Sequence, residues 1–284
     1  MNKKEQVWLV TGASSGFGRA LVEELISDGY PVVATARKLD SLSDLGTGEA
    51  DTLKLSLDVT QPEQIRDVVS QAESHFGSID VLVNNAGYGY FGAMEESDQT
   101  EVRQMMETNF WGANNMALAV LPKMRAKRSG RIINVTSIGG LAAFPTFAYY
   151  HATKFAMEGL FQSLRKQVAP LGIQVTNVEP GAFRTKWAGA SHKGAKNLID
   201  DYSLVHEARL VSEKRSGSQD GDPKLAAKAF IKLAHMKEQP MHYLFGTDAY
   251  KMAVEGYENS LSEFKEYRDD ETHLSFGDDD YWKK

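Results

Sequence analysis

The protein has 284 residues, of which 42% are hydrophobic and 25% are charged, and its formal net charge is −6. That length and apolar content suit one large α/β domain or two smaller ones, and the negative charge argues against a general nucleic-acid binder. The absence of cysteine excludes disulfides, thiol catalysis and thiolate metal sites. No apolar run approaches the roughly 18 residues of a membrane span, so we expect a cytoplasmic protein.

Short β-branched runs alternate along the chain with longer amphipathic segments. Several of the runs are apolar on both faces, as is typical of strands in a parallel sheet that helices cover on both sides. The alternation predicts a single-domain, doubly wound (Rossmann-like) α/β fold of about seven strands over residues 1–284. The expected strands are Val7–Val10, Val32–Ala36, Leu53–Val59, Asp80–Asn84, Arg131–Ser137, Ile173–Val178 and Met241–Phe245.

The first expected strand is followed by TGASSGFGRAL, whose three glycines precede a helical pattern. Glycines at such a turn let the backbone approach a pyrophosphate, which then binds the N–H groups at the helix N-terminus. An ordinary strand–helix turn can also be glycine-rich, but the position after the first strand of an alternating pattern favours a dinucleotide site. No Lys-Ser/Thr pair follows the last glycine, so this is not a Walker loop. The cofactor-binding residues expected in this loop are Gly12, Ser14, Ser15, Gly16, Phe17 and Gly18.

The second expected strand ends in VVATARK, which places Arg37 where a site for NAD usually has an acid. An arginine at that position suits a ribose 2′-phosphate instead. A basic pair at a strand end can also be plain solvated surface, but together with the upstream glycine loop it indicates NADP(H). Asp58, which is followed by Val59, could accept a hydrogen bond from the adenine amino group. Alternatively Asp58, or more readily Thr60, caps the next helix.

Asparagines follow the fourth expected strand in the stretch VLVNNAG. This stretch could be a structural turn, because asparagine and glycine both tolerate left-handed backbone conformations. It also lies at the carboxyl end of a central strand, where ligands bind in such sheets. We therefore expect Asn85, Ala86 and Gly87 to contact the cofactor.

Tyr150 has a lysine, Lys154, four residues later, and it is the only one of the 11 tyrosines with that spacing. On a helix this spacing brings the two side chains to one face. A cation beside a phenol favours the phenolate and lowers the pKa of the phenol. Ser137 precedes Tyr150 by 13 residues at the end of the fifth expected strand, so both can face one crevice.

The chain resembles the short-chain dehydrogenase/reductase family from about Val7 to Phe245. The resemblance rests on TGASSGFG, NNAG, Asn109 in TNFWGA, Ser137, YYHATK and PGAFRT, in order and at family-like spacing. It implies that Tyr150 is the general acid/base and that Ser137 hydrogen-bonds the substrate oxygen. Without the resemblance, Asn109 would be read as a packing residue. The family implies instead that it anchors a water that links the lysine of YYHATK to solvent.

The resemblance further implies that Lys154 lowers the pKa of Tyr150 and holds the nicotinamide ribose. It makes the chain an NADP(H)-dependent oxidoreductase that interconverts a carbonyl and a secondary alcohol. A weak likeness of the C-terminal region to hydroxysteroid and retinol dehydrogenases hints at a bulky apolar substrate. The rival interpretation is a non-catalytic NADP(H)-binding sensor on the same fold. The cofactor contacts expected in the second half of the chain are Tyr150, Lys154, Pro180, Gly181, Phe183 and Thr185.

The remaining regions carry weaker signals. Residues 185–222 are long, polar and aromatic-containing, which suggests a substrate loop or lid, and residues 269–284 suggest a flexible acidic tail. The seven histidines show no metal-ligand spacing, so we expect no metal site. Family members commonly pair through the helices that here carry Asn109 and Tyr150, so we expect a homodimer or homotetramer.

Overall fold

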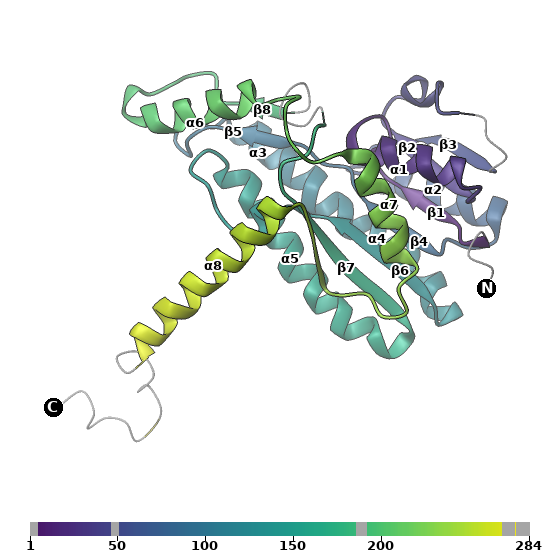
Figure 1. The fold of residues 1–284 in the computed structure, drawn as a ribbon. Helices are drawn as coiled ribbons and strands as arrows, with labels where there is room; N and C mark the ends of the chain where they lie inside the picture. The colour runs from purple at the N-terminus through teal and green to yellow at the C-terminus, as the bar shows by residue number, and fades with distance from the viewer. Residues whose placement is uncertain (1–4, 47–50, 186–191, 269–275, 277–284) are drawn as a thin grey trace.

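The computed structural model describes residues 5–46, 51–185, 192–268 and 276. A seven-stranded sheet lies at its centre, with the strand order β3-β2-β1-β4-β6-β7-β9 and every neighbouring pair parallel (Figure 1). The predicted doubly wound sheet of seven parallel strands is therefore confirmed. The strands are β1 (Trp8–Val10), β2 (Val32–Ala36), β3 (Thr52–Ser56), β4 (Val81–Asn84), β6 (Gly130–Val135), β7 (Ile173–Pro180) and β9 (His242–Phe245).

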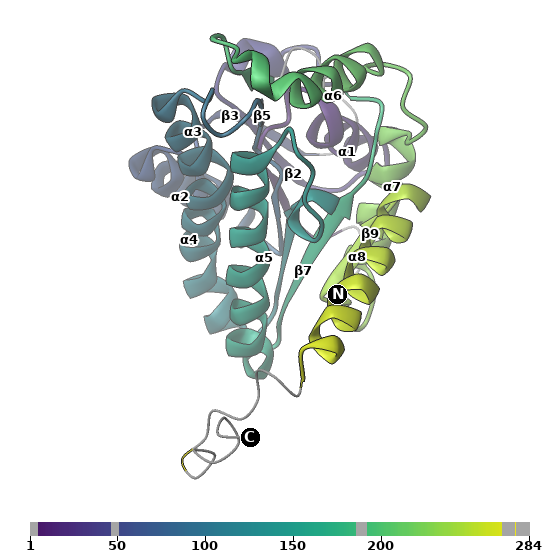
Figure 2. The ribbon, with the colours of Figure 1, turned by 90° about the vertical axis from the view of Figure 1, so that its left-hand side faces the viewer.

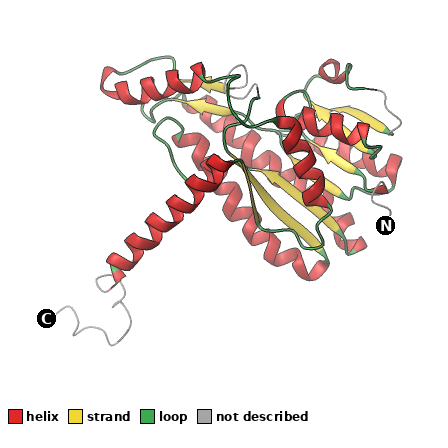
Figure 3. Ribbon diagram, viewed as in Figure 1, coloured by secondary structure: helices red, strands yellow, loops and turns green. Residues whose placement is uncertain are grey.

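Helices cover both faces of this sheet, as Figure 2 shows from the side and Figure 3 by element type. One face carries α1 (Gly16–Ser27) and α7 (Pro223–Ala234), and the other carries α2 (Pro62–Phe76), α4 (Gly112–Lys127) and α5 (Ala148–Val168). The remaining helices are α3 (Gln99–Met106), α6 (Ser203–Lys214) and α8 (Thr247–Glu266).

The inner strands are buried on both faces because their side chains alternate between two apolar layers. Along β1, Trp8 and Val10 belong to the core cluster that contains α1 and α7, while Leu9 belongs to the cluster with α2, α4 and α5. All three side chains have no exposed surface. This two-sided burial explains why the strands read as continuous apolar runs.

The order of the strands places a topological switch point between β1 and β4. From β1 the chain proceeds outward to β2 and β3, and then crosses back to β4 on the other side of β1. In open parallel sheets the crevice for a ligand forms outside the carboxyl ends of the strands at such a point. The glycine loop follows β1 and NNAG follows β4, so both lie beside this crevice.

Two expected strands are shorter at their carboxyl ends than predicted. The third ends at Ser56 rather than Val59, and the fifth at Val135 rather than Ser137. After the third strand, the side chain of Asp58 accepts hydrogen bonds from the backbone N–H and the hydroxyl of Thr60, which turns the chain out of the sheet. Neither residue caps the next helix, because α2 begins at Pro62 with Gln61 as its N-cap.

The segment expected as a loop over residues 185–222 contains regular structure. It contributes α6 and a short strand, β8 (His192–Gly194), which pairs in parallel with β5 (Gly89–Phe91) in a separate two-stranded sheet. Residues 186–191, and the tail from 269 apart from residue 276, lie outside the described residues. Among the described helices, none is both long and apolar enough to cross a membrane.

Candidate active site

A cavity of about 760 Å³ lies at the carboxyl ends of β1, β2, β4, β6 and β7. The glycine loop and the residues after β2 and β4 line one part of it, and Ser137, Tyr150 and Lys154 line another. Residues predicted from separate motifs therefore meet in one place. Of all the predicted site residues, only Gly18 and Asn109 do not line the cavity.

The glycine loop is tied to the stretch after β4 by Thr11 and Asn85. The hydroxyl oxygen of Thr11 accepts hydrogen bonds from the backbone N–H groups of Asn85 and Ala86, each at 3.0 Å. The side-chain amide of Asn85 in turn donates to the carbonyl oxygens of Thr11 and Gly12 at 2.8 and 3.1 Å. Thr11 is not among the predicted site residues, although its place directly before the first glycine of the loop was a signal.

Two glycines of this loop have backbone angles that other residues rarely adopt, with φ of +70° at Gly12 and +59° at Gly16. Gly16 begins α1, and the N-cap residue Ser15 makes no side-chain capping bond in the described structure. The first N–H groups of α1 therefore have no capping partner from that side chain, and they lie at the positive end of the helix dipole. Such a helix end suits an anionic group in the cavity.

Arg37 and Asp58 lie at the part of the cavity beyond β2 and β3. Within the described residues, the Arg37 side chain makes no hydrogen bond or ion pair, and it is exposed. Among the cavity-lining residues, Asp58 is the single carboxylate, so cationic side chains outnumber acidic ones. This balance favours a ligand that carries negative charge.

Tyr150 lies at the start of α5 and is only 7% exposed. Burial raises the pKa of Tyr150 to about 12, and a hydrogen bond with Ser137 acts in the opposite direction. Burial also lowers the pKa of Lys154 to about 8, against the opposing charge of Glu158. Ser137, Tyr150 and Lys154 thus bring together a partly buried hydroxyl, a buried phenol and a buried amine.

The expected lowering of the Tyr150 pKa by Lys154 is not what this structure shows. The Lys154 ammonium donates to the carbonyl oxygen of Val135 at 2.9 Å, and it lies 5.7 Å from the centroid of the Tyr150 ring. The loss of solvent around the phenol, rather than the charge of Lys154, therefore sets the direction in which the pKa of Tyr150 shifts. The neighbouring Tyr149 points elsewhere, and its hydroxyl accepts a hydrogen bond from Gln99 at 3.0 Å.

Asn109 is fully buried in a π-helical segment, Glu107–Trp111, that joins α3 to α4. Its side-chain amide donates to the carbonyl oxygen of Tyr88 at 2.9 Å and to the hydroxyl of Thr153 at 3.1 Å, and its Oδ1 accepts from the Tyr88 N–H. A Cβ added at Gly87 would lie 3.1 Å from Asn109 Oδ1 and 3.8 Å from Lys154 Nζ. Asn109 therefore fastens the chain after β4 to α5 and also lies close to Lys154.

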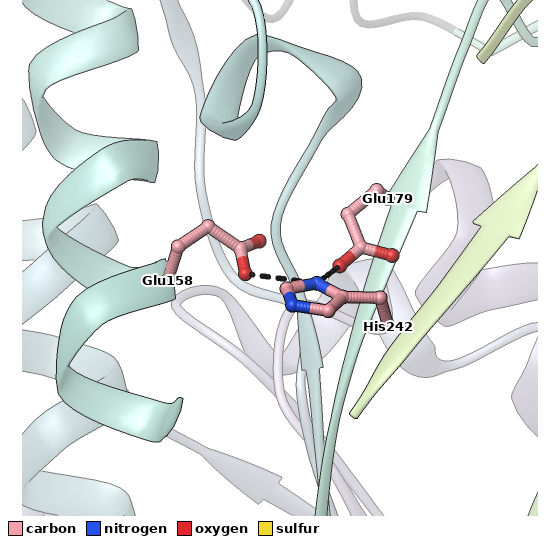
Figure 4. A group of neighbouring side chains, drawn as sticks. All are labelled: Glu158, Glu179 and His242. Carbon is pink, nitrogen blue, oxygen red and sulfur yellow. Dashed lines mark hydrogen bonds and ion pairs between the residues drawn. The ribbon is translucent and has the colours of Figure 1, made fainter. Parts of the chain in front are cut away.

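Glu158, four residues after Lys154 on α5, forms a cluster with Glu179 and His242 in which the two acids are buried and the imidazole is partly exposed (Figure 4). His242 Nδ1 is 2.7 Å from Glu179 Oε1 and 3.6 Å from Glu158 Oε2. Burial raises the pKa of Glu179 to about 7 and also raises the pKa of Glu158, while the hydrogen bond to Glu179 raises the pKa of His242. Both acids and the imidazole thus hold their protons to a higher pH than they ordinarily would.

The same cluster continues into a row of asparagines across the sheet. Asn84 donates to Asn134, Asn134 donates to Asn177, and Asn177 donates to Glu158 at 2.6 Å. The ligand atoms of Glu158, Glu179 and His242 lie within 4.8 Å of one another, a spacing that could hold a metal ion. The sequence indicates no metal site, because these three residues lie far apart in the chain and show no local ligand spacing.

Another part of the cavity wall is formed by β8 and α6. Lys193, Ala208, Val211, Ser212 and Arg215 line the cavity there. Sequence patterns did not single out any of these residues. They lie in the segment expected to be a substrate loop, and they give the cavity a wall of mixed polar and apolar character.

A short chain dehydrogenase family model matches residues 6–196. A 3-ketodihydrosphingosine reductase of Bacteroides thetaiotaomicron is 38% identical over 247 residues, which cover 85% of this chain and 88% of the relative.

Solved structures of short-chain dehydrogenases are also similar to this chain. A short-chain dehydrogenase from Streptomyces avermitilis has a TM-score of 0.86 and 37% identity, and the match covers 93% of this chain and 97% of that one. A short-chain dehydrogenase from Burkholderia cenocepacia in complex with NADP has a TM-score of 0.73 and 26% identity, covering 94% of this chain and 98% of that one.

Proposed function

The chain belongs to the short-chain dehydrogenase/reductase family of oxidoreductases, and from this membership we propose that it interconverts a carbonyl and a secondary alcohol with NADP(H). One observation carries the proposal. A single cavity is lined by the glycine loop, by Arg37, and by Ser137, Tyr150 and Lys154. A site that only bound the cofactor would not need the last three residues together.

The preference for NADP(H) is supported by charge and position. Arg37 follows β2, where the adenosine ribose would lie if the pyrophosphate were bound at the N-terminus of α1. A guanidinium binds a phosphate through charge-assisted hydrogen bonds, and an NAD-preferring site would have an acid here. The structurally similar Burkholderia cenocepacia protein was solved with NADP.

The proposed chemistry divides among three side chains. NADPH, when bound, supplies the hydride to the carbonyl carbon. Ser137 donates a hydrogen bond to the carbonyl oxygen, where negative charge develops. Tyr150 donates the proton, and its raised pKa keeps it protonated at neutral pH, which is the form that reduction requires. The Lys154 ammonium lies 5.7 Å from the centroid of the Tyr150 ring and so places a positive charge beside the phenol.

The substrate is proposed to be a bulky, largely apolar carbonyl compound. Ala208 and Val211 of α6 supply apolar surface to the cavity. A relative of 38% identity bears the name of a reductase for a long-chain keto compound. Chain length would therefore be the first variable to change in a substrate series.

The test is a panel of ketones of increasing chain length, with NADPH consumption followed by absorbance. We expect turnover that rises with chain length, and loss of that turnover in Ser137→Ala. Tight NADPH binding, with a reaction no faster than in Ser137→Ala on every ketone, would instead support the non-catalytic NADP(H)-binding sensor.

A further inference from the structure

His151, the residue directly after Tyr150, is 5% exposed and bonded through both ring nitrogens. The backbone N–H of Phe144 donates to Nε2 at 2.8 Å, and Nδ1 lies 2.8 Å from the carbonyl oxygen of Gly139. Because Nε2 accepts, the ring proton is on Nδ1, which donates to Gly139. Burial lowers the pKa of His151 and so favours this neutral form. The ring thus joins α5 to two points of the segment that follows β6.

Gly139 connects this imidazole to Ser137. The backbone N–H of Gly139 donates to Ser137 Oγ at 2.9 Å, and its carbonyl accepts from His151. A Cβ at this position would lie 2.8 Å from His151 Nδ1 and 3.3 Å from Ser137 Oγ, so the glycine is closely held between the two side chains. Since the N–H of Gly139 occupies a lone pair of Ser137 Oγ, the hydroxyl hydrogen of Ser137 points away from that N–H group.

We propose that His151 is a positioning residue that orients the Ser137 hydroxyl toward the substrate oxygen. His151 does not itself line the cavity, so it acts through Gly139 rather than by touching substrate. The inference rests on the proposed function, in which Ser137 donates to the carbonyl. A ring that only fastened the segment would affect folding, whereas a positioning residue affects the rate of the chemical step.

Three variants at this position separate the two hydrogen bonds. His151→Leu removes both, and we expect kcat to fall about 10- to 100-fold with unchanged NADPH affinity, because small displacements of a transition-state donor have effects of this size. The amide nitrogen of asparagine reaches the place of Nδ1 and can donate to Gly139, whereas the amide oxygen of glutamine reaches the place of Nε2 and can accept from Phe144. His151→Asn should therefore restore the bond to Gly139 and most of the kcat, and His151→Gln should not. If His151→Leu fails to fold, equal kcat in the asparagine and glutamine variants would still overturn the proposal.

A double-mutant cycle with Ser137→Ala is the decisive experiment. If His151 acts through Ser137, His151→Leu should lower kcat by less than about twofold once the hydroxyl is gone. A full further loss would refute the positioning role. His75→Leu, on the outer surface of α2, serves as the matched control, and thermal unfolding reports on folding. If Ser137→Ala is slow but His151→Leu is not, this inference alone fails; if Ser137→Ala is fully active, the proposed function fails.

Discussion

Replacing Tyr150 by phenylalanine should abolish most turnover and leave the fold nearly unchanged. The ring contacts with Phe147 and His151, each with ring centroids 6.2 Å apart, do not involve the hydroxyl. The main loss to stability is the hydrogen bond with Ser137, about 1 kcal/mol. The loss to catalysis is that of a positioned acid, about 10²–10⁴-fold or about 3–5 kcal/mol of the barrier. The expected rise in the activation barrier is therefore several times the expected loss in the free energy of unfolding.

The measurement compares Tyr150→Phe with Tyr149→Phe on the same ketone, with NADPH binding followed by fluorescence. Tyr149 does not line the cavity, and its hydroxyl contacts Gln99 at the surface. Tyr149→Phe should therefore keep turnover within a few-fold, and both variants should bind NADPH. A nearly active Tyr150→Phe together with an inactive Tyr149→Phe would show that the wrong tyrosine has been assigned.

Three other perturbations have defined outcomes. Arg37→Ala should weaken NADPH binding at least about tenfold, which corresponds to a loss of about 1.5–3 kcal/mol of binding free energy. NADH binding should change little. A parent protein that prefers NADH would contradict this prediction. Because the pKa of Glu179 is about 7 when folded and its ordinary value is 4.5, the native state holds a proton that the unfolded chain loses. Stability should therefore fall by about 3 kcal/mol as pH rises from about 5 to 8, and the raised pKa of His242 acts in the same sense. Thermal unfolding against pH should show a flatter slope for Glu179→Gln, and parallel slopes would refute the assignment. Light scattering should give a dimer or tetramer of the parent protein at micromolar concentration. The double variant Leu118→Glu, Phe155→Glu, which changes exposed positions of α4 and α5, should be monomeric. A monomeric parent protein would exclude this surface as a subunit interface.

The sequence predicted the central strands well because their burial leaves a local signature. Val32–Ala36 was predicted with the bounds observed, since a short run with Thr35 as its one polar residue has few other interpretations in an alternating chain. The short strands β5 and β8 have only three residues each and pair across about a hundred residues of chain. No local pattern records that pairing.

The features of the candidate site also divide into those with a local sequence signal and those without one. The spacing of Tyr150 and Lys154 is local, so it could be read from the chain. The contact of His242 with Glu158 and Glu179 depends on how strands and a helix far apart in the sequence come together. The raised pKa of Tyr150 is also a consequence of burial, which spacing alone does not reveal.

The π-helical segment that carries Asn109 has a consequence for engineering this protein. A π turn contains one residue more than the α-helical ladder on either side, so deleting one residue would let α3, the segment and α4 merge into one regular helix. Regular i→i+4 bonding makes that product the preferred outcome of a design guided by stability alone. The deletion would also remove the wider turn that carries Asn109 and so move its side chain away from Tyr88. Thermostabilised versions should therefore keep the chain length between α3 and α4 fixed.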